Sequence, residues 1–147
     1  MIGYMITWAT YGSWLQGGEK GYSKDGVQHS KDPMLLRANL KRLQKPAVKL
    51  DARQKQIVRD EVYKVAERLG QRVYSVAVCS NHVHIVVSNI LEEIDSVVGR
   101  YKGSTAFVLK KCGVDGKVWA RGIDKRFCFD EESLQARIEY VARHGEE

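Results

Sequence analysis

The sequence lacks any run of about 18 apolar residues, which is the length that a membrane-spanning helix requires. Its N-terminus, Met1 to Trp8, also lacks the charged-then-apolar order of a signal peptide. No internal repeat or low-complexity segment is present. These absences argue against a membrane protein and predict a cytoplasmic one.

Cysteine is also scarce, with three residues in the whole chain. Cys79, Cys112 and Cys128 are odd in number and far apart, which argues against both a disulfide framework and a zinc site built from paired CxxC motifs. We therefore expect three reduced cysteines in the core.

What is present suffices for one globular domain over residues 1–147, because 44% of the 147 residues are hydrophobic. Lys and Arg number 24 against 18 Asp and Glu, which gives a formal net charge of +6. Such a surface attracts polyanions, including nucleic acid. Composition alone, however, favours a merely soluble basic protein.

Apolar periodicity and turn residues predict an α+β fold. The predicted strands cover residues 3–10, 72–80, 82–88 and 117–130, and the predicted helices cover residues 51–69, 91–112 and 130–144. This order is the split βαβ, or ferredoxin-like, pattern: an antiparallel sheet with helices on one face, here followed by an additional C-terminal helix. Residues 12–33 are Gly-rich and aperiodic and predict a long loop, and residues 34–45 allow a further helix.

Two of the four histidines lie in one predicted strand, in the stretch "CSNHVHIVVSN". Side chains alternate across a strand, so His82 and His84 point to one face while Val83 and Ile85 point to the other. Two imidazoles on one face can bind one metal ion. A pair of hydrogen-bonded structural histidines is the commoner explanation of such a motif.

The last predicted helix adds a tyrosine and a third histidine. Leu134, Ile138 and Val141 form its apolar stripe, and Tyr140 and His144 project together one turn apart, roughly 80–120° away from that stripe. If the helix lies over the strand, they complete a site of three ligands and a nucleophile. The alternative is a half-packed tyrosine and a helix-terminal histidine favoured by the dipole.

The strand text "NHVHIVV" and the helix text "RIEYVARH" resemble the signatures of the single-tyrosine HUH transposases, in particular the REP-associated tyrosine transposases. The stretches "RYKGSTAFVLKKCG", "VWARGIDKRF" and "ITWATYGSWLQGGEKG" are also similar to segments of these proteins. The similarity covers most of the chain in the right order.

The resemblance implies a ferredoxin-like domain whose C-terminal helix carries the nucleophile. His82 and His84 then bind a divalent ion, Mg²⁺ or Mn²⁺, and Tyr140 attacks a phosphodiester of single-stranded DNA to give a 5′-phosphotyrosine and a free 3′-OH. The fourth residue after the tyrosine is commonly an amide in the family, whereas here it is His144. Three imidazoles suit Mn²⁺, Zn²⁺ or Ni²⁺ better than Mg²⁺.

These residue types fit the chemistry. A phosphodiester repels anionic nucleophiles, so a metal ion is needed to polarise an oxygen and neutralise charge. A phenol, with a pKa of roughly 10, is a poor nucleophile but a reasonable leaving group, so a DNA 3′-OH can reverse the bond.

Several further residues could contact DNA, although each is more often an ordinary surface residue. The candidates for phosphate contacts are Lys102, Ser104, Arg121, Lys125 and Arg126. Trp14, in the Gly-rich segment, is the candidate for stacking on an unpaired base. The DNA target, including a hairpin, and the choice between a monomer and a homodimer that exchanges the tyrosine helix stay open.

Two other functions compete with the transposase. A non-catalytic nucleic-acid-binding module of the same fold would need exposed aromatic residues on the sheet where this sequence has histidines. A nucleotide hydrolase of the histidine-triad kind would need a third alternating histidine, and position 86 is Val86.

Overall fold

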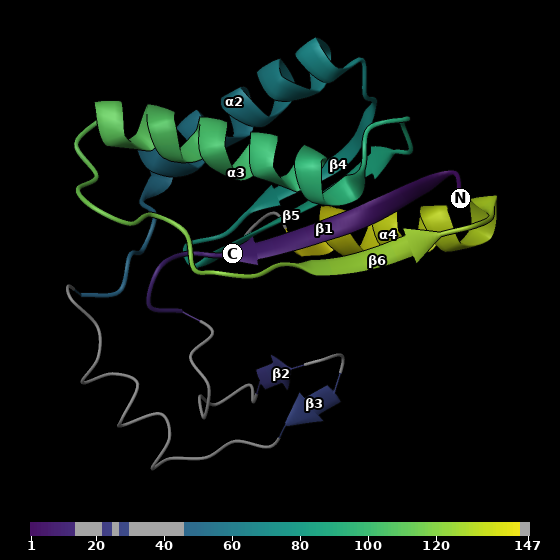
Figure 1. The fold of residues 1–147 in the computed structure, drawn as a ribbon, viewed down its shortest axis with the longest axis horizontal. Coiled ribbons are helices and arrows are strands. Elements are labelled where there is room, and N and C mark those ends of the chain that lie inside the picture. Colours follow the sequence, from purple (N-terminus) through teal and green to yellow (C-terminus); the bar gives the residue numbers. More distant parts are fainter. Residues whose placement is uncertain (14–21, 25–26, 30–45, 145–147) are drawn as a thin grey trace.

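A computed structural model describes residues 1–13, 22–24, 27–29 and 46–144 of the chain (Figure 1). Four antiparallel strands form its main sheet in the order β4-β5-β1-β6. The strands are β1 (Gly3–Ala9), β4 (Val73–Val78), β5 (His82–Ser88) and β6 (Asp124–Cys128), and the helices are α2 (Ala52–Leu69), α3 (Ile94–Lys111) and α4 (Glu131–His144).

Helices cover both faces of this sheet. Figure 1 shows α2 and α3 side by side on one face and α4 on the opposite face. The core under α2 and α3 is the larger one and includes Tyr4, Ile6 and Trp8 of β1. A smaller core under α4 contains Met5, Ala77, Val86, Cys128, Leu134 and Val141. The sheet therefore separates two hydrophobic cores.

The central strand β1 explains this arrangement. All seven of its residues are buried, because β5 and β6 flank it and helices cover both of its faces. Successive side chains alternate, so Met5 enters the core under α4 while Ile6 enters the core under α2 and α3. Pairing of β1 with β5 places Thr7 opposite His84 and Ala9 opposite His82.

Local sequence signals fix the ends of the helices. Asp51 forms a capping box with Gln54 at the start of α2, and Gly70 ends that helix in the left-handed conformation at φ 68°. At the start of α4, the Asp130 carboxylate accepts a hydrogen bond of 2.7 Å from the backbone N–H of Ser133. This cap lowers the pKa of Asp130.

The predicted ferredoxin-like α+β order is confirmed, with helices on one face and a further C-terminal helix on the other. The last strand is shorter than predicted, because Trp119 makes only an isolated bridge with Thr10 and the ladder to β1 begins at Asp124. Within the predicted loop over residues 12–33, β2 (Tyr22–Lys24) and β3 (Val27–His29) pair as a short antiparallel ribbon. The predicted helix over residues 34–45 lies outside the described residues.

The expected burial of the cysteines is only partly confirmed. Cys79 and Cys128 are buried and free, whereas Cys112 is free but exposed because it follows the last turn of α3.

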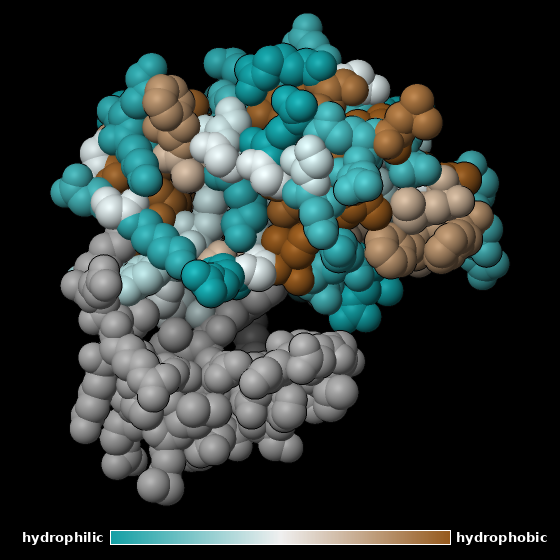
Figure 2. All heavy atoms as spheres, in the orientation of Figure 1, coloured by the Kyte–Doolittle hydropathy of each residue, from teal (hydrophilic) through white to brown (hydrophobic). Residues whose placement is uncertain are grey.

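No described helix has both the length and the apolar character to cross a bilayer. On the surface, Figure 2 shows an apolar patch where β6 ends, which is where the exposed rings of Phe127 and Phe129 contact each other.

Candidate functional site

His82 and His84 form the centre of the site on the sheet face that α4 covers. They are 5% and 7% exposed, and their ring centroids are 4.6 Å apart. Between them Val83 points into the opposite core. The predicted orientation of both imidazoles toward one face is therefore confirmed.

Each of these rings has a hydrogen-bond partner at Nδ1. The Oδ1 atom of Asn81 lies 2.6 Å from Nδ1 of His82, and the Oγ1 atom of Thr7 lies 2.7 Å from Nδ1 of His84. Such contacts fix the rotation of an imidazole ring. Nε2 is then the nitrogen through which either ring would bind a ligand.

Helix α4 brings Tyr140 and His144 to this histidine pair. The ring centroid of His84 is 5.8 Å from that of Tyr140 and 5.3 Å from that of His144, and the latter two rings are 4.2 Å apart. Both residues are half-buried beside the apolar stripe of Leu134 and Val141. The four residues singled out from the sequence therefore lie together, although 56 residues separate His84 from Tyr140 by subtraction.

The end of α4 forms hydrogen bonds with a residue next to the sheet and within its own last turn. The thiol of Cys79, just after β4, donates to the backbone oxygen of His144 at 3.4 Å. The Nδ1 atom of His144 lies 2.9 Å from the backbone oxygen of Tyr140, one turn earlier. These contacts hold the ring of His144 close to that of Tyr140.

The donor set fits a divalent ion in part. His82 and His84 are a buried, oriented imidazole pair of the kind that transition-metal ions bind. Over the described residues, however, no group of three or more His, Cys, Asp or Glu side chains is arranged to hold one ion. The structure thus places two oriented imidazoles together with a third, His144, next to them, and metal binding by the three histidines stays a prediction.

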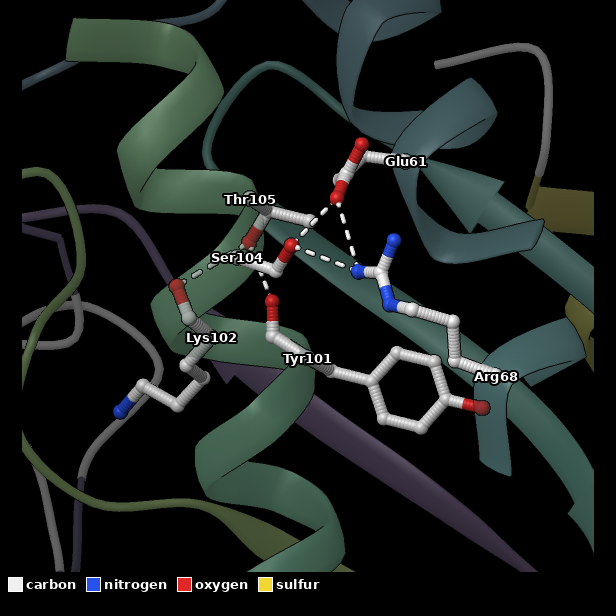
Figure 3. A network of polar contacts seen from close by, with 6 residues as sticks. All are labelled: Glu61, Arg68, Tyr101, Lys102, Ser104 and Thr105. Carbon is white, nitrogen blue, oxygen red and sulfur yellow. Dashed lines mark hydrogen bonds and ion pairs between the residues drawn. The ribbon is translucent and has the colours of Figure 1, made fainter. Parts of the chain in front are cut away.

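Two of the proposed DNA contacts lie on the α3 side of the sheet and have structural partners. Lys102 donates from Nζ to the backbone oxygens of Ala120 and Gly122 at 2.9 and 3.2 Å, and burial, followed by the charge of Lys117, lowers its pKa. Ser104 donates to the carboxylate of Glu61 and accepts from Arg68 at 3.2 Å (Figure 3). Both residues hold neighbouring elements together.

The neighbouring cations of β6 point to opposite faces of the sheet. Lys125 pairs with Ile6 of β1 and so shares the α3 face, where its ammonium contacts Asp95 at 2.9 Å. Arg126 pairs with Met5 and so shares the α4 face with the histidines. Its Nε donates to Asp124 at 2.9 Å, and 56% of its side chain is exposed.

Arg121 is exposed in the connection that leads into β6. The preceding Ala120 donates its N–H to the backbone oxygen of Ala9 at 2.8 Å, and Ala9 lies opposite His82. Arg121 thus lies beside the end of β1, and the carbonyls of the residues on either side of it accept hydrogen bonds from Lys102 of α3. Trp14 lies outside the described residues.

Sequence reasoning missed Thr7 and Asn81, the partners of the histidine rings. Asn81 could have been suspected, because it directly precedes His82 and its amide oxygen is within reach. Thr7 carried no such signal, since only the register between β1 and β5 brings it opposite His84.

Solved structures with a similar fold include a REP-associated tyrosine transposase bound to a REP hairpin, with a TM-score of 0.59 and 13% identity over 98% of this chain and 68% of that one. The chain therefore shares the fold of that protein. A transposase-like crystal structure from Deinococcus radiodurans is also similar, with a TM-score of 0.49 and 16% identity over 97% of this chain and 90% of that one. No family model and no curated protein matches the chain by sequence.

Proposed function

We propose that the protein cuts and rejoins single-stranded DNA through a 5′-phosphotyrosine intermediate, as a metal-dependent HUH-type transposase or a domesticated relative of one. The observation that carries the proposal is the position of Tyr140, whose ring contacts His84 and His144 on the same face of the sheet. A phenol is a weak nucleophile that needs an adjacent base or a metal ion, and the imidazoles beside Tyr140 are suited to supply either.

In the proposed reaction the Oη atom of Tyr140 forms a bond to phosphorus and the bond from phosphorus to the 3′-oxygen breaks. The phenolic proton leaves and the 3′-oxygen gains a proton, so the products are a 5′-phosphotyrosine and a 3′-OH. Attack by a DNA 3′-OH on the same phosphorus reverses these changes. Rejoining therefore needs no external energy source.

His82 and His84, with His144 beside them, would hold the divalent ion, Mg²⁺ or Mn²⁺. When bound, such an ion polarises a non-bridging phosphate oxygen and offsets the charge that develops during attack. Thr7 and Asn81 orient the rings, and the small core under α4 keeps Tyr140 next to them.

The substrate we propose is single-stranded DNA, including strands that flank a hairpin. The net charge of +6 favours a polyanion, and Arg126 adds a cation on the histidine side of the sheet. The similar transposase whose structure contains a REP hairpin makes hairpin DNA the first substrate to test.

A non-catalytic module that binds nucleic acid on its sheet is less consistent with the structure. Such modules stack bases on aromatic side chains of an open sheet face. Here α2 and α3 cover one face and α4 covers the other. The histidine-triad hydrolase is also disfavoured, because Val86 packs in the core under α4.

The test is incubation of the protein and Mn²⁺ with hairpin DNA that has single-stranded flanks and is labelled at either its 5′ or its 3′ end. A denaturing gel should show the 3′ label bound to protein and the 5′ label on a shorter, free strand. Tyr140→Phe should abolish both products. Tyr74→Phe is the matched control, since Tyr74 also packs against the core under α4. Equal products from both variants would disprove the role of Tyr140.

A further inference from the structure

Thr7 lies in the middle of β1 and is 2% exposed. It pairs directly with His84 across the antiparallel ladder, so both side chains share the α4 face. The Oγ1 atom of Thr7 and the Nδ1 atom of His84 are 2.7 Å apart and share a hydrogen bond. Nothing in the proposed reaction requires this hydroxyl to touch the DNA.

We infer that Thr7 is a positioning residue, whose hydroxyl oxygen accepts the Nδ1–H of His84 and so holds the tautomer with the lone pair on Nε2. That lone pair is what a metal ion needs from a neutral imidazole. The inference rests on the proposed function, because the tautomer matters only if His84 is a ligand.

The neighbouring histidine shows which tautomer the site favours. The Oδ1 atom of Asn81 is an amide oxygen, which can only accept, so the hydrogen bond of 2.6 Å requires a hydrogen on Nδ1 of His82. The lone pair of His82 is then on Nε2. Both rings use the same nitrogen for their contact, so the same tautomer at His84 gives a matched pair of Nε2 donors.

A threonine suits this position for two reasons. Its β-branched side chain has few rotamers in a strand, so the hydroxyl is held at a defined place. A hydroxyl, however, can also donate, and donation to Nδ1 would put the hydrogen of His84 on Nε2, where it blocks a metal ion. The direction of this one hydrogen bond therefore decides whether His84 can serve as a ligand.

The experiment uses the full chain with ¹⁵N-labelled histidine. Thr7→Val removes the hydroxyl and keeps the shape, and Thr7→Ser keeps the hydroxyl. Thr105→Val is the matched control, because Thr105 is a fully buried threonine on α3 whose hydroxyl donates to the backbone oxygen of Tyr101 at 2.6 Å. Thr7→Ala is a second hydroxyl-free variant in case Thr7→Val does not fold.

Two measurements follow. Long-range ¹H–¹⁵N spectra of the metal-free protein should show Nδ1–H on His84 in the wild type, Thr7→Ser and Thr105→Val, and a mixture of tautomers in Thr7→Val. Calorimetric titration with Mn²⁺ should give a binding constant about 10–100-fold weaker in Thr7→Val than in the wild type.

An unchanged Nδ1–H tautomer of His84 in Thr7→Val and Thr7→Ala would overturn the inference. Wild-type protein that binds no Mn²⁺ would instead count against the proposed metal site, and the spectra of the metal-free protein would still decide the role of Thr7. The two failures are therefore distinguishable.

Discussion

At the residue scale, the four side chains of the candidate site differ in their burial. His82 and His84 are almost fully buried in a central strand, and each has a partner at Nδ1. Tyr140 and His144 are half-buried near the end of the last helix. The histidine pair is thus the more deeply buried part of the site, and the helix residues are the part more accessible to a ligand.

His144 allows a direct test of the metal preference. We expect His144→Ala to weaken Mn²⁺ binding by about tenfold, or about 1.4 kcal/mol, because an imidazole beside the pair is lost. His144→Asn should restore part of the binding and favour Mg²⁺ relative to Mn²⁺, since an amide oxygen is a harder donor.

Titration calorimetry with each ion measures both effects of these substitutions. Arg143→Ala, at the exposed neighbouring position, is the control. Unchanged Mn²⁺ affinity in His144→Ala would remove His144 from the metal site.

At the element scale, β6 is an edge strand whose two faces have different neighbours. Lys125 contacts Asp95 of α3 on one face, whereas Arg126 lies on the face of the histidines. Because successive side chains in a strand point to opposite faces, these adjacent cations are separated by the full thickness of the sheet. Of the two, only Arg126 lies on the face where we propose that DNA binds.

We therefore predict that Arg126→Ala weakens binding of single-stranded DNA. The plot of the logarithm of the association constant against the logarithm of the salt concentration should become less steep by about 0.7, the value for one lost phosphate contact. Lys125→Ala should leave both quantities near the wild-type values. Fluorescence polarisation at several salt concentrations gives the two slopes. An equal loss of DNA affinity in the two variants would contradict the prediction that DNA binds on the Arg126 face of β6.

At the scale of the whole molecule, α4 docks on the sheet of its own chain. Leu134 and Val141 of α4 pack with Met5, Val86 and Cys128 of the strands, so Tyr140 contacts the His84 of the same chain. The complete set of four residues is assembled within one chain. A homodimer is therefore not needed to bring the tyrosine to the histidines.

Mixing two inactive variants tests this arrangement. We predict that His84→Ala and Tyr140→Phe give no covalent complex with labelled DNA when combined, because neither chain has both groups. If the mixture regains about a quarter or more of the wild-type complex on a denaturing gel, α4 must be exchanged between two chains. The unmixed variants and the wild type are the controls.

Features that depend on local periodicity can be predicted from the amino-acid sequence. Alternation along a strand placed His82 and His84 on one face, and the helical repeat placed Tyr140 and His144 together beside an apolar stripe. The order of strands and helices followed from the same periodicities together with caps such as Asp51 and Gly70. These relations need only a few neighbouring residues, so they can be read without knowing the fold.

Which surfaces contact each other becomes known only from the folded chain. The docking of α4 over β5, the register that sets Thr7 against His84, and the opposite faces of Lys125 and Arg126 all depend on contacts between distant segments. Strand register and helix docking are set by the summed packing of two cores, a property of the whole chain that no single motif contains.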